Sequence, residues 1–199
     1  PMGTANGSTD VANTDSCSAA ASPWVERWLS GLPAGAKVLD LACGGGRHVH
    51  AALARGLTVC AIDRDAAALA QLPEAVERLE FDLEQGAWPW ADRRFDAIVV
   101  TNYLYRPLFD TLVAALGEGG ILIYETFADG NARYGRPSNP DFLLRAGELR
   151  TKVAERLHVL AFEDGYAAAP RPARVQRVAA LRMPAHDDAQ AELLERFAL

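Results

Sequence analysis

The chain has 199 residues, half of them hydrophobic, which suits one domain with a sizeable core. Its formal net charge is -6, and its 20 basic residues are scattered, with no run of Lys or Arg that could follow a phosphate backbone. We therefore expect no nucleic-acid partner. No apolar run is long enough to cross a bilayer, so we expect no membrane partner either. Three cysteines without metal-ligand spacing predict free thiols in a reducing cytoplasm and no metal site.

Residues 1–22 are small and polar, and we expect this segment to be disordered because it offers little apolar surface to bury. Residues 23–199 are expected to form a single domain.

Strand and helix patterns alternate along that domain. Strands are predicted at 37–42, 57–63, 79–84, 94–102, 121–127, 158–166 and 174–184. Helices are predicted at 23–32, 48–55, 65–72, 106–120, 147–157 and 187–199. This order predicts an α/β fold with a mainly parallel, doubly wound, seven-stranded sheet and helices on both faces. The connection between the last two strands is too short for a parallel crossover, so we expect the last strand to run antiparallel.

The stretch VLDLACGGGRH (38–48) ends a buried strand in three glycines, which let a ligand approach the backbone and offer it N–H groups. No Gly-Lys-Ser/Thr follows, which excludes a phosphate loop, and Val49 stands where a dinucleotide fingerprint needs its third glycine. The spacing fits acid-x-Gly/Ala-x-Gly-x-Gly, which is met by Asp40, Ala42, Gly44 and Gly46. A tight strand-to-helix turn without a ligand is the alternative.

Two acids follow the next two predicted strands. Asp63 stands where a carboxylate can accept both hydroxyls of a ribose, and Asp82 stands where it can meet the exocyclic amine of an adenine. Each could instead cap a helix or a loop. Together with the glycines they predict a pocket for a nucleoside with a polar tail that is not a phosphate.

On VLDLACGGGRH, LTVCAIDRD, EFDLE, RFDAIVVTNYL and ILIYETF, residues 23–184 resemble the class I S-adenosylmethionine-dependent methyltransferases. The resemblance implies a Rossmann-like fold and S-adenosyl-L-methionine as cofactor. By the resemblance, Gly44 and Gly46 line the methionine end, Asp63 holds the ribose, and Asp82 with Leu83 contacts the adenine. The expected cofactor site also includes Asp40, Ala42, Arg64 and Asn102. Within the class, ETFADGNARYGRPSNPDFLLRAGEL resembles a small bacterial group near the tellurite-resistance methyltransferases.

Candidates for the acceptor side follow the fourth and fifth predicted strands. Asn102, Tyr103 and Glu125 are the catalytic candidates, with Glu125 as a base or an orienting acceptor, although a cap for the following loop is an equal alternative for Glu125. Tyr103 and Tyr105 are also expected to contact the substrate, although packing under the next helix is an equal alternative. The Asp/Asn-Pro-Pro-aromatic motif of nucleic-acid amino-methyltransferases is absent, because the sequence reads Asn-Tyr-Leu-Tyr. His48 could be a base, but a packing role fits a histidine at a helix start better.

The predicted loop at 127–146 is long and rich in arginine, as lids and binding segments often are. We expect it to close over the pocket, with Arg133 and Arg136 binding an anionic group of the substrate; a solvated loop is the alternative.

The sequence therefore predicts a methyltransferase for a small-molecule acceptor with an oxygen, sulfur or chalcogen nucleophile. A binding module or sensor without chemistry is the rival interpretation, and Val49 disfavours a nicotinamide or nucleotide-sugar enzyme.

Overall fold

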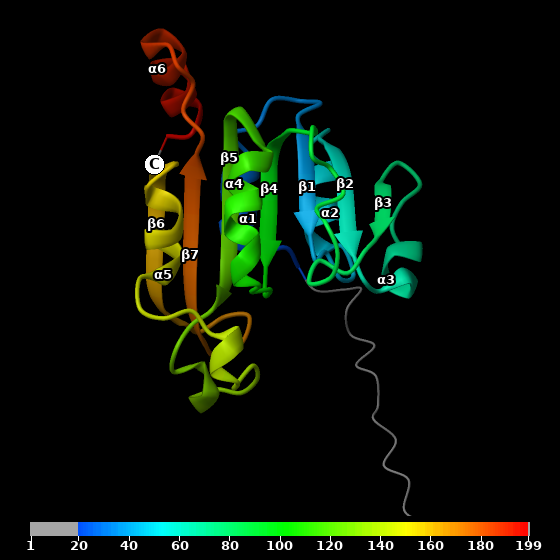
Figure 1. The fold of residues 1–199 in the computed structure, drawn as a ribbon, viewed down its shortest axis with the longest axis vertical. Helices are drawn as coiled ribbons and strands as arrows, with labels where there is room; N and C mark the ends of the chain where they lie inside the picture. Colours follow the sequence, from blue (N-terminus) through cyan, green and yellow to red (C-terminus); the bar gives the residue numbers. More distant parts are fainter. Residues whose placement is uncertain (1–19, 199) are drawn as a thin grey trace, which may run out of the picture.

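The computed structural model describes residues 20–198, so the expectation of disorder for the N-terminal segment falls outside it for residues 1–19. One seven-stranded sheet has the order β3-β2-β1-β4-β5-β7-β6 (Figure 1). Its strands are β1 (Lys37–Leu41), β2 (Thr58–Asp63), β3 (Glu77–Glu80), β4 (Phe95–Thr101), β5 (Leu116–Phe127), β6 (His158–Ala167) and β7 (Ala173–Leu181). None of the helices within residues 20–198 has the length and apolar character needed to cross a bilayer.

The pairing pattern confirms a mainly parallel sheet with an antiparallel last strand. β1 pairs in parallel with β2 and with β4, and β4 pairs in parallel with β5. β7 runs antiparallel to both neighbours, β5 and β6, and its arrow points opposite to theirs in Figure 1. The chain order reverses between β1 and β4, so the loops after these two strands diverge at the edge where ligands bind in such sheets.

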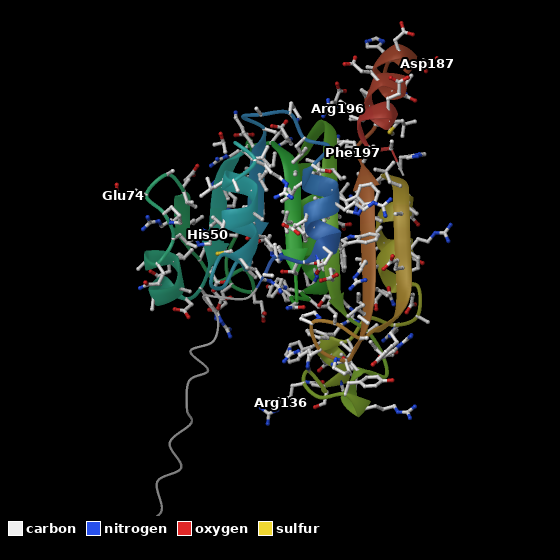
Figure 2. The ribbon with its side chains drawn as sticks, turned by 180° about the vertical axis from the view of Figure 1, so that it is seen from behind. His50, Glu74, Arg136, Asp187, Arg196 and Phe197 are labelled. Atoms are coloured by element: carbon white, nitrogen blue, oxygen red, sulfur yellow. The ribbon has the colours of Figure 1, made fainter. Side chains whose placement is uncertain are left out.

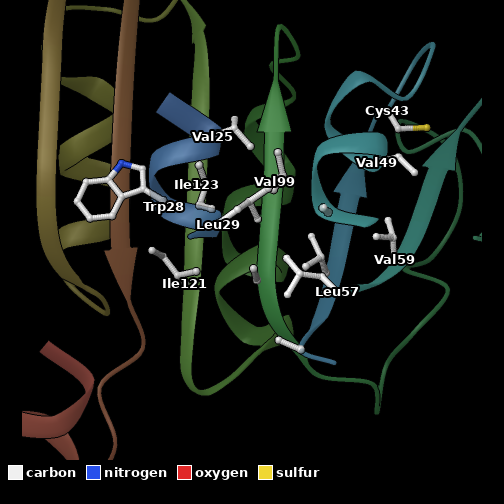
Figure 3. Close-up of a cluster of buried hydrophobic side chains, with 14 of the residues drawn as sticks. Val25, Trp28, Leu29, Cys43, Val49, Leu57, Val59, Val99, Ile121 and Ile123 are labelled. Atoms are coloured by element: carbon white, nitrogen blue, oxygen red, sulfur yellow. The ribbon is translucent and has the colours of Figure 1, made fainter. Parts of the chain in front are cut away.

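Helices cover both faces of the sheet. α1 (Pro23–Leu29), α2 (Arg47–Leu53) and α3 (Ala66–Ala70) pack on one face, and α4 (Phe109–Ala115) and α5 (Glu148–Ala154) pack on the other. α6 (Asp187–Arg196) reaches the first face through Leu193, with Phe197 just beyond it. Figure 3 shows the first core, in which Val25, Trp28 and Leu29 of α1 lie over Val99, Ile121 and Ile123 of the sheet. Burial on both faces explains why the central strands are mostly apolar, with Asp40 of β1 and Glu125 of β5 as buried exceptions.

The prediction of one helix over 106–120 is wrong at both ends. A 3₁₀ turn (Arg106–Leu108) precedes α4, which ends at Ala115, and β5 begins at the next residue. The glycines serve the strand and not a helix end. A Cβ on Gly120 would lie 2.9 Å from the carbonyl oxygen of Phe95, and the register between β4 and β5 shifts beside Phe95. A close approach of two backbones requires glycine there.

The third predicted strand is displaced in the same way. β3 covers Glu77–Glu80 and ends where its partner β2 ends, because Glu80 pairs with Asp63. Asp82 therefore lies two residues beyond the strand, in the loop that follows it.

Candidate functional site

A pocket of about 470 Å³, here called the first pocket, opens at the carboxyl ends of β1, β2 and β4. Seven residues proposed from the sequence line it, namely Ala42, Asp63, Arg64, Asp82, Leu83, Asn102 and Tyr103. Sequence reasoning missed the other seven, which are Phe81, Glu84, Leu104, Thr126, Phe127, Pro137 and Phe142. Phe81 and Leu104 each adjoin a proposed residue, so a wider reading of those two motifs would have found them.

Asp63 is held in place by the backbone on two sides. Its Oδ2 accepts a hydrogen bond from the Gly44 N–H at 2.8 Å, and its Oδ1 accepts one from the Asp65 N–H at 2.9 Å. A carboxylate with two such bonds keeps lone pairs for further donors. The side chain at the end of β2 is therefore preorganised to accept the paired hydroxyls of a ribose.

The glycine loop needs its glycines for two different reasons. Gly46 has a φ of +76°, and a Cβ there would lie 2.2 Å from Leu72 Cδ2, so internal packing demands glycine. Gly44 has a φ of +51°, and a Cβ there would meet nothing within 4 Å. The space above Gly44 is thus open to a ligand. Ala42 also adopts a positive φ, +53°, beside the first pocket.

Asp40 lies beneath this loop with an unsatisfied oxygen. The residue is 2% exposed, and its Oδ2 has no hydrogen-bond partner. Burial raises the pKa of Asp40 to about 7, against the opposing effect of the nearby Arg47 charge. A buried acceptor without a donor is costly, so an ammonium group at the glycine loop fits this position. With the ribose acceptor at Asp63 and the space over Gly44, the residues present fit S-adenosylmethionine.

Asp82 closes the turn after β3. Its Oδ1 accepts a bond from the Glu84 N–H at 3.0 Å, and its Oδ2 accepts one from Gln85 Nε2 at 3.0 Å. Leu83 is buried and lines the first pocket. Because each carboxylate oxygen has two lone pairs, Asp82 can cap this turn and still accept a hydrogen bond from an adenine amine.

A second pocket, of about 340 Å³, adjoins the first and shares Asn102 and Phe127 with it. Its other lining residues come from distant parts of the sequence and are Ala20, Ala21, Ser22, Pro23, Arg47, Glu125, Ala167, Ala169, Pro170, Arg171, Ala173, Val175 and Arg177. Of the residues proposed for catalysis, Asn102 lines both pockets, Tyr103 only the first and Glu125 only the second.

Glu125 is buried and ion-paired. Arg177 Nε donates to Glu125 Oε2, and Arg177 Nη1 donates to Glu163 Oε2 at 2.9 Å. The pairing follows from the sheet register, which sets Arg177 opposite both Glu125 and Glu163. Within residues 20–198, no hydrogen bond reaches Glu125 Oε1, so this oxygen remains available to a donor in the second pocket.

His48 is committed to the protein's own structure. Its Nε2 accepts the Ser22 N–H at 3.1 Å, which leaves the proton on Nδ1, where Thr101 Oγ1 lies at 3.3 Å. Burial, helped by the Arg47 charge, lowers the pKa of His48 to about 3. The packing interpretation of this residue fits the geometry, and a role as base does not.

The Tyr103 hydroxyl is buried and has no hydrogen-bond partner within residues 20–198. Its pKa is raised well above the ordinary range, mainly by burial and to a smaller extent by the charges of nearby acids. The hydroxyl of Tyr124 donates to the Tyr103 carbonyl oxygen at 2.8 Å. Tyr103 is therefore a protonated donor at the first pocket and not a base.

The loop 128–146 after β5 is anchored at several points. Arg106 donates to the carbonyl oxygens of Asp141 and Leu143, both at 2.8 Å, and pairs with Glu148 at 2.7 Å. Asn131 is 2% exposed; its Nδ2 donates to the Pro137 carbonyl oxygen at 3.0 Å. The loop reaches the first pocket through Pro137 and Phe142.

Three residues proposed for the substrate lie away from both pockets. Arg133 and Arg136 are exposed, and Figure 2 shows Arg136 pointing outward from the loop. Neither they nor Tyr105 is among the lining residues. Within residues 20–198, no cluster of three or more His, Cys, Asp or Glu side chains could hold a metal ion.

Comparison with known proteins also points to methyltransferases. Residues 38–120 match the family described as a methyltransferase domain. A curated relative, ribosomal RNA small subunit methyltransferase H of Gemmatimonas aurantiaca, is 31% identical over 144 residues, which are 70% of this chain and 44% of the relative. The chain thus spans less than half the length of this relative.

Two solved structures share the fold at low identity. TehB from Haemophilus influenzae superposes with a TM-score of 0.62 at 18% identity, covering 74% of this chain and 57% of that one. The N-methyltransferase NodS from Bradyrhizobium japonicum superposes with a TM-score of 0.61 at 19% identity, covering 80% and 93%. At these identities the likeness is one of fold. Residues 38–120 are therefore similar to a methyltransferase domain, and the chain shares its fold with these two solved structures.

Proposed function

We propose that the chain is an S-adenosylmethionine-dependent methyltransferase that acts on a small-molecule acceptor held in the second pocket. The observation that carries this proposal is the junction of the two pockets at Asn102 and Phe127. A site that offers acceptors to a nucleoside and a largely apolar site meet there, as a transfer between two bound molecules requires.

The first pocket would hold the cofactor. Asp82 and Leu83 would contact the adenine, Asp63 would accept from the ribose, and Gly44 and Asp40 would meet the amino-acid end. Arg64, Ala42 and Asn102 complete this set. When bound, S-adenosylmethionine supplies a methyl group on a positively charged sulfur.

The chain's own residues then position the acceptor and exclude water. Phe127, 7% exposed, forms a wall between the two sites, and Asn102 offers a side-chain amide at their junction. The residues at the junction would hold the acceptor nucleophile in line with the methyl group that the cofactor would supply, with a neutral thioether as the leaving group. A proton on the nucleophile leaves to Glu125 Oε1 or to water. Alignment of this kind can supply about 7 kcal/mol or more of the barrier reduction.

The loop 128–146 remains part of the proposal as a cover for the first pocket. Its contacts through Arg106 and Asn131 favour a fixed wall, with Pro137 and Phe142 against the bound cofactor.

The second candidate function is a module that binds the cofactor without catalysing a reaction. It is favoured by the hydrogen bonds and protonation of the three side chains that could act as bases. Glu125 is tied to Arg177, Tyr103 is held protonated and His48 is occupied. Because none of these three groups is a strong base, turnover depends on an acceptor that is itself a good nucleophile, such as a phenolate, a thiolate or a chalcogen oxyanion.

Titration calorimetry with S-adenosylmethionine and S-adenosylhomocysteine tests the cofactor half of the proposal. We expect micromolar dissociation constants for the intact protein and at least about 100-fold weaker binding for Asp63→Ala. Asp65→Ala is the matched control. It removes a side chain that caps α3 through the Ala67 and Ala68 N–H groups, at about 1 kcal/mol, and keeps the backbone donor to Asp63. Equal binding by all three proteins would overturn the proposed site.

Formation of S-adenosylhomocysteine from S-adenosylmethionine in the presence of acceptors separates the enzyme from the module. Cofactor binding without product across oxygen, sulfur and chalcogen nucleophiles would favour the module.

A further inference from the structure

We propose that the second pocket selects a ring-sized, largely apolar acceptor that carries one carboxylate, which Arg171 binds with help from Arg47. The inference rests on the proposed function and deepens it, because it assigns a substrate class to the acceptor side of the same site.

The charges that line the second pocket do not balance. Its ionisable lining residues are Arg47, Glu125, Arg171 and Arg177. Arg177 is shared by two carboxylates, those of Glu125 and Glu163. Arg47 and Arg171 have no ion-pair partner within residues 20–198, and Arg47 acts on the buried Asp40 only at a distance. A pocket with two spare cations, in a chain whose net charge is -6, suits an anion.

Apart from Ser22 and Asn102, the rest of the lining is apolar. Phe127, Pro170 and Val175 stand among alanines and Pro23, and the guanidinium carbon of Arg171 lies 6.0 Å from the centre of the Phe127 ring. A volume of about 340 Å³ is near the small end for ligand pockets and leaves room for one or two rings. Arg171 is exposed, but its guanidinium lies against the apolar Phe127 ring, where a charge pair is stronger than between groups that water surrounds on all sides.

Arg171 separates the acceptor from the cofactor. Arg47 opens α2 next to the glycine loop, where it could also meet the carboxylate at the methionine end of the cofactor. Arg171 belongs to the connection between β6 and β7 and lines only the second pocket. An effect that depends on Arg171 therefore reports on the acceptor.

The other end of the acceptor lies at the junction of the pockets. Glu125 Oε1 and the Asn102 amide border that end, and a carboxylate oxygen accepts from a hydroxyl. The acceptor class that satisfies both ends is a hydroxy acid with an aromatic or similarly flat apolar body, and 4-hydroxybenzoate is its simplest probe.

The test titrates 4-hydroxybenzoate and its uncharged analogue 4-hydroxybenzamide into the protein saturated with S-adenosylhomocysteine. We expect the acid to bind about tenfold tighter than the amide, in line with one charge-assisted pair. The preference should vanish in Arg171→Gln and shrink as ionic strength rises. It should persist in Arg78→Gln, which alters an exposed arginine on β3, outside both pockets.

Equal affinity for acid and amide, no binding of either, or a preference that survives in Arg171→Gln would overturn the inference. Binding of S-adenosylhomocysteine is measured first on each protein. If it is retained while the acid preference is missing, the inference alone fails; if it is absent from the unaltered protein, the proposed function fails.

Discussion

The two pockets are built in opposite ways. Most of the first pocket comes from Ala42 to Leu104, and its key acid is fixed by two backbone N–H groups before any ligand arrives. The second pocket takes residues from 20 to 177, and its polar groups are long arginines on an apolar lining. A common ligand can be held by a local, rigid motif. The variable ligand is held by side chains that tertiary structure brings together, and this half is where specificity can change without loss of the cofactor.

The largest difference is expected between Gly44→Ala, which alters the glycine loop of the first pocket, and its control Gly35→Ala. Both glycines have a positive φ, +51° and +79°, and neither would place a Cβ within 4 Å of another atom. Each change should cost about 1–2 kcal/mol of folding free energy. Only the Cβ at 44 enters the space reserved for a ligand, so we expect binding of S-adenosylhomocysteine to fall at least about 100-fold for that variant alone. Similar affinities of the two variants in calorimetry would mean that the loop does not face the ligand.

The next largest effect concerns the loop that covers the first pocket. Arg106→Ala removes the ion pair with Glu148 and two bonds to loop carbonyl oxygens. We expect the free energy of unfolding to fall by about 2 kcal/mol, because the Leu143 carbonyl oxygen and the Glu148 carboxylate, both part-buried, lose their donor. Urea unfolding measures this, with Arg78→Ala as a control that should change stability by less than about 0.5 kcal/mol. Equal loss in both variants would show that the loop is not anchored by Arg106.

A smaller effect, which depends on pH, is expected for Asp40, the buried acid beneath the glycine loop. The folded pKa of Asp40, about 7, lies above its ordinary value of 3.8, so the folded state holds the proton longer than the unfolded state does. Its contribution to stability is therefore greatest below about pH 4 and is lost as pH rises through 7. Asn at this position cannot ionise, so at pH 8 the free energy of unfolding of Asp40→Asn should exceed that of the parent by about 1 kcal/mol or more, and this difference should close below about pH 4.

The same variant should bind S-adenosylhomocysteine about tenfold more weakly at pH 8, since the amide offers no charge to an ammonium group. Higher stability together with unchanged affinity would remove Asp40 from the cofactor site.

The smallest effect is expected on the outer side of the loop. Arg133 and Arg136 are exposed and line neither pocket, so Arg133→Gln with Arg136→Gln should change the affinity for 4-hydroxybenzoate by less than about twofold. A loss as large as that of Arg171→Gln would restore the sequence-based hypothesis that the loop arginines bind the anion.

More lining residues of the first pocket than of the second could be predicted from the sequence, and the reason is physical. The spacing from Asp40 to Gly46 and the acid at the end of β2 are local patterns that a parallel strand fixes by itself. The bounds of β3 and α4 depend on partners, namely the end of β2 at Asp63 and the approach of Gly120 to Phe95, and were predicted wrongly. The pairing of Arg177 with Glu125 depends on the register between β5 and β7, which no local pattern in the chain encodes. Arg171 lies in the connection between β6 and β7, and its place at the second pocket likewise depends on the tertiary structure.

A crystal structure of the protein bound to S-adenosylhomocysteine tests the division of the two pockets most directly. The account predicts density for the ribose on Asp63, the amino group near Asp40, and the sulfur directed toward Asn102 and Phe127, with the second pocket free of the nucleoside. An adenosine group in the second pocket, or an amino-acid end that reaches Arg171, would contradict it.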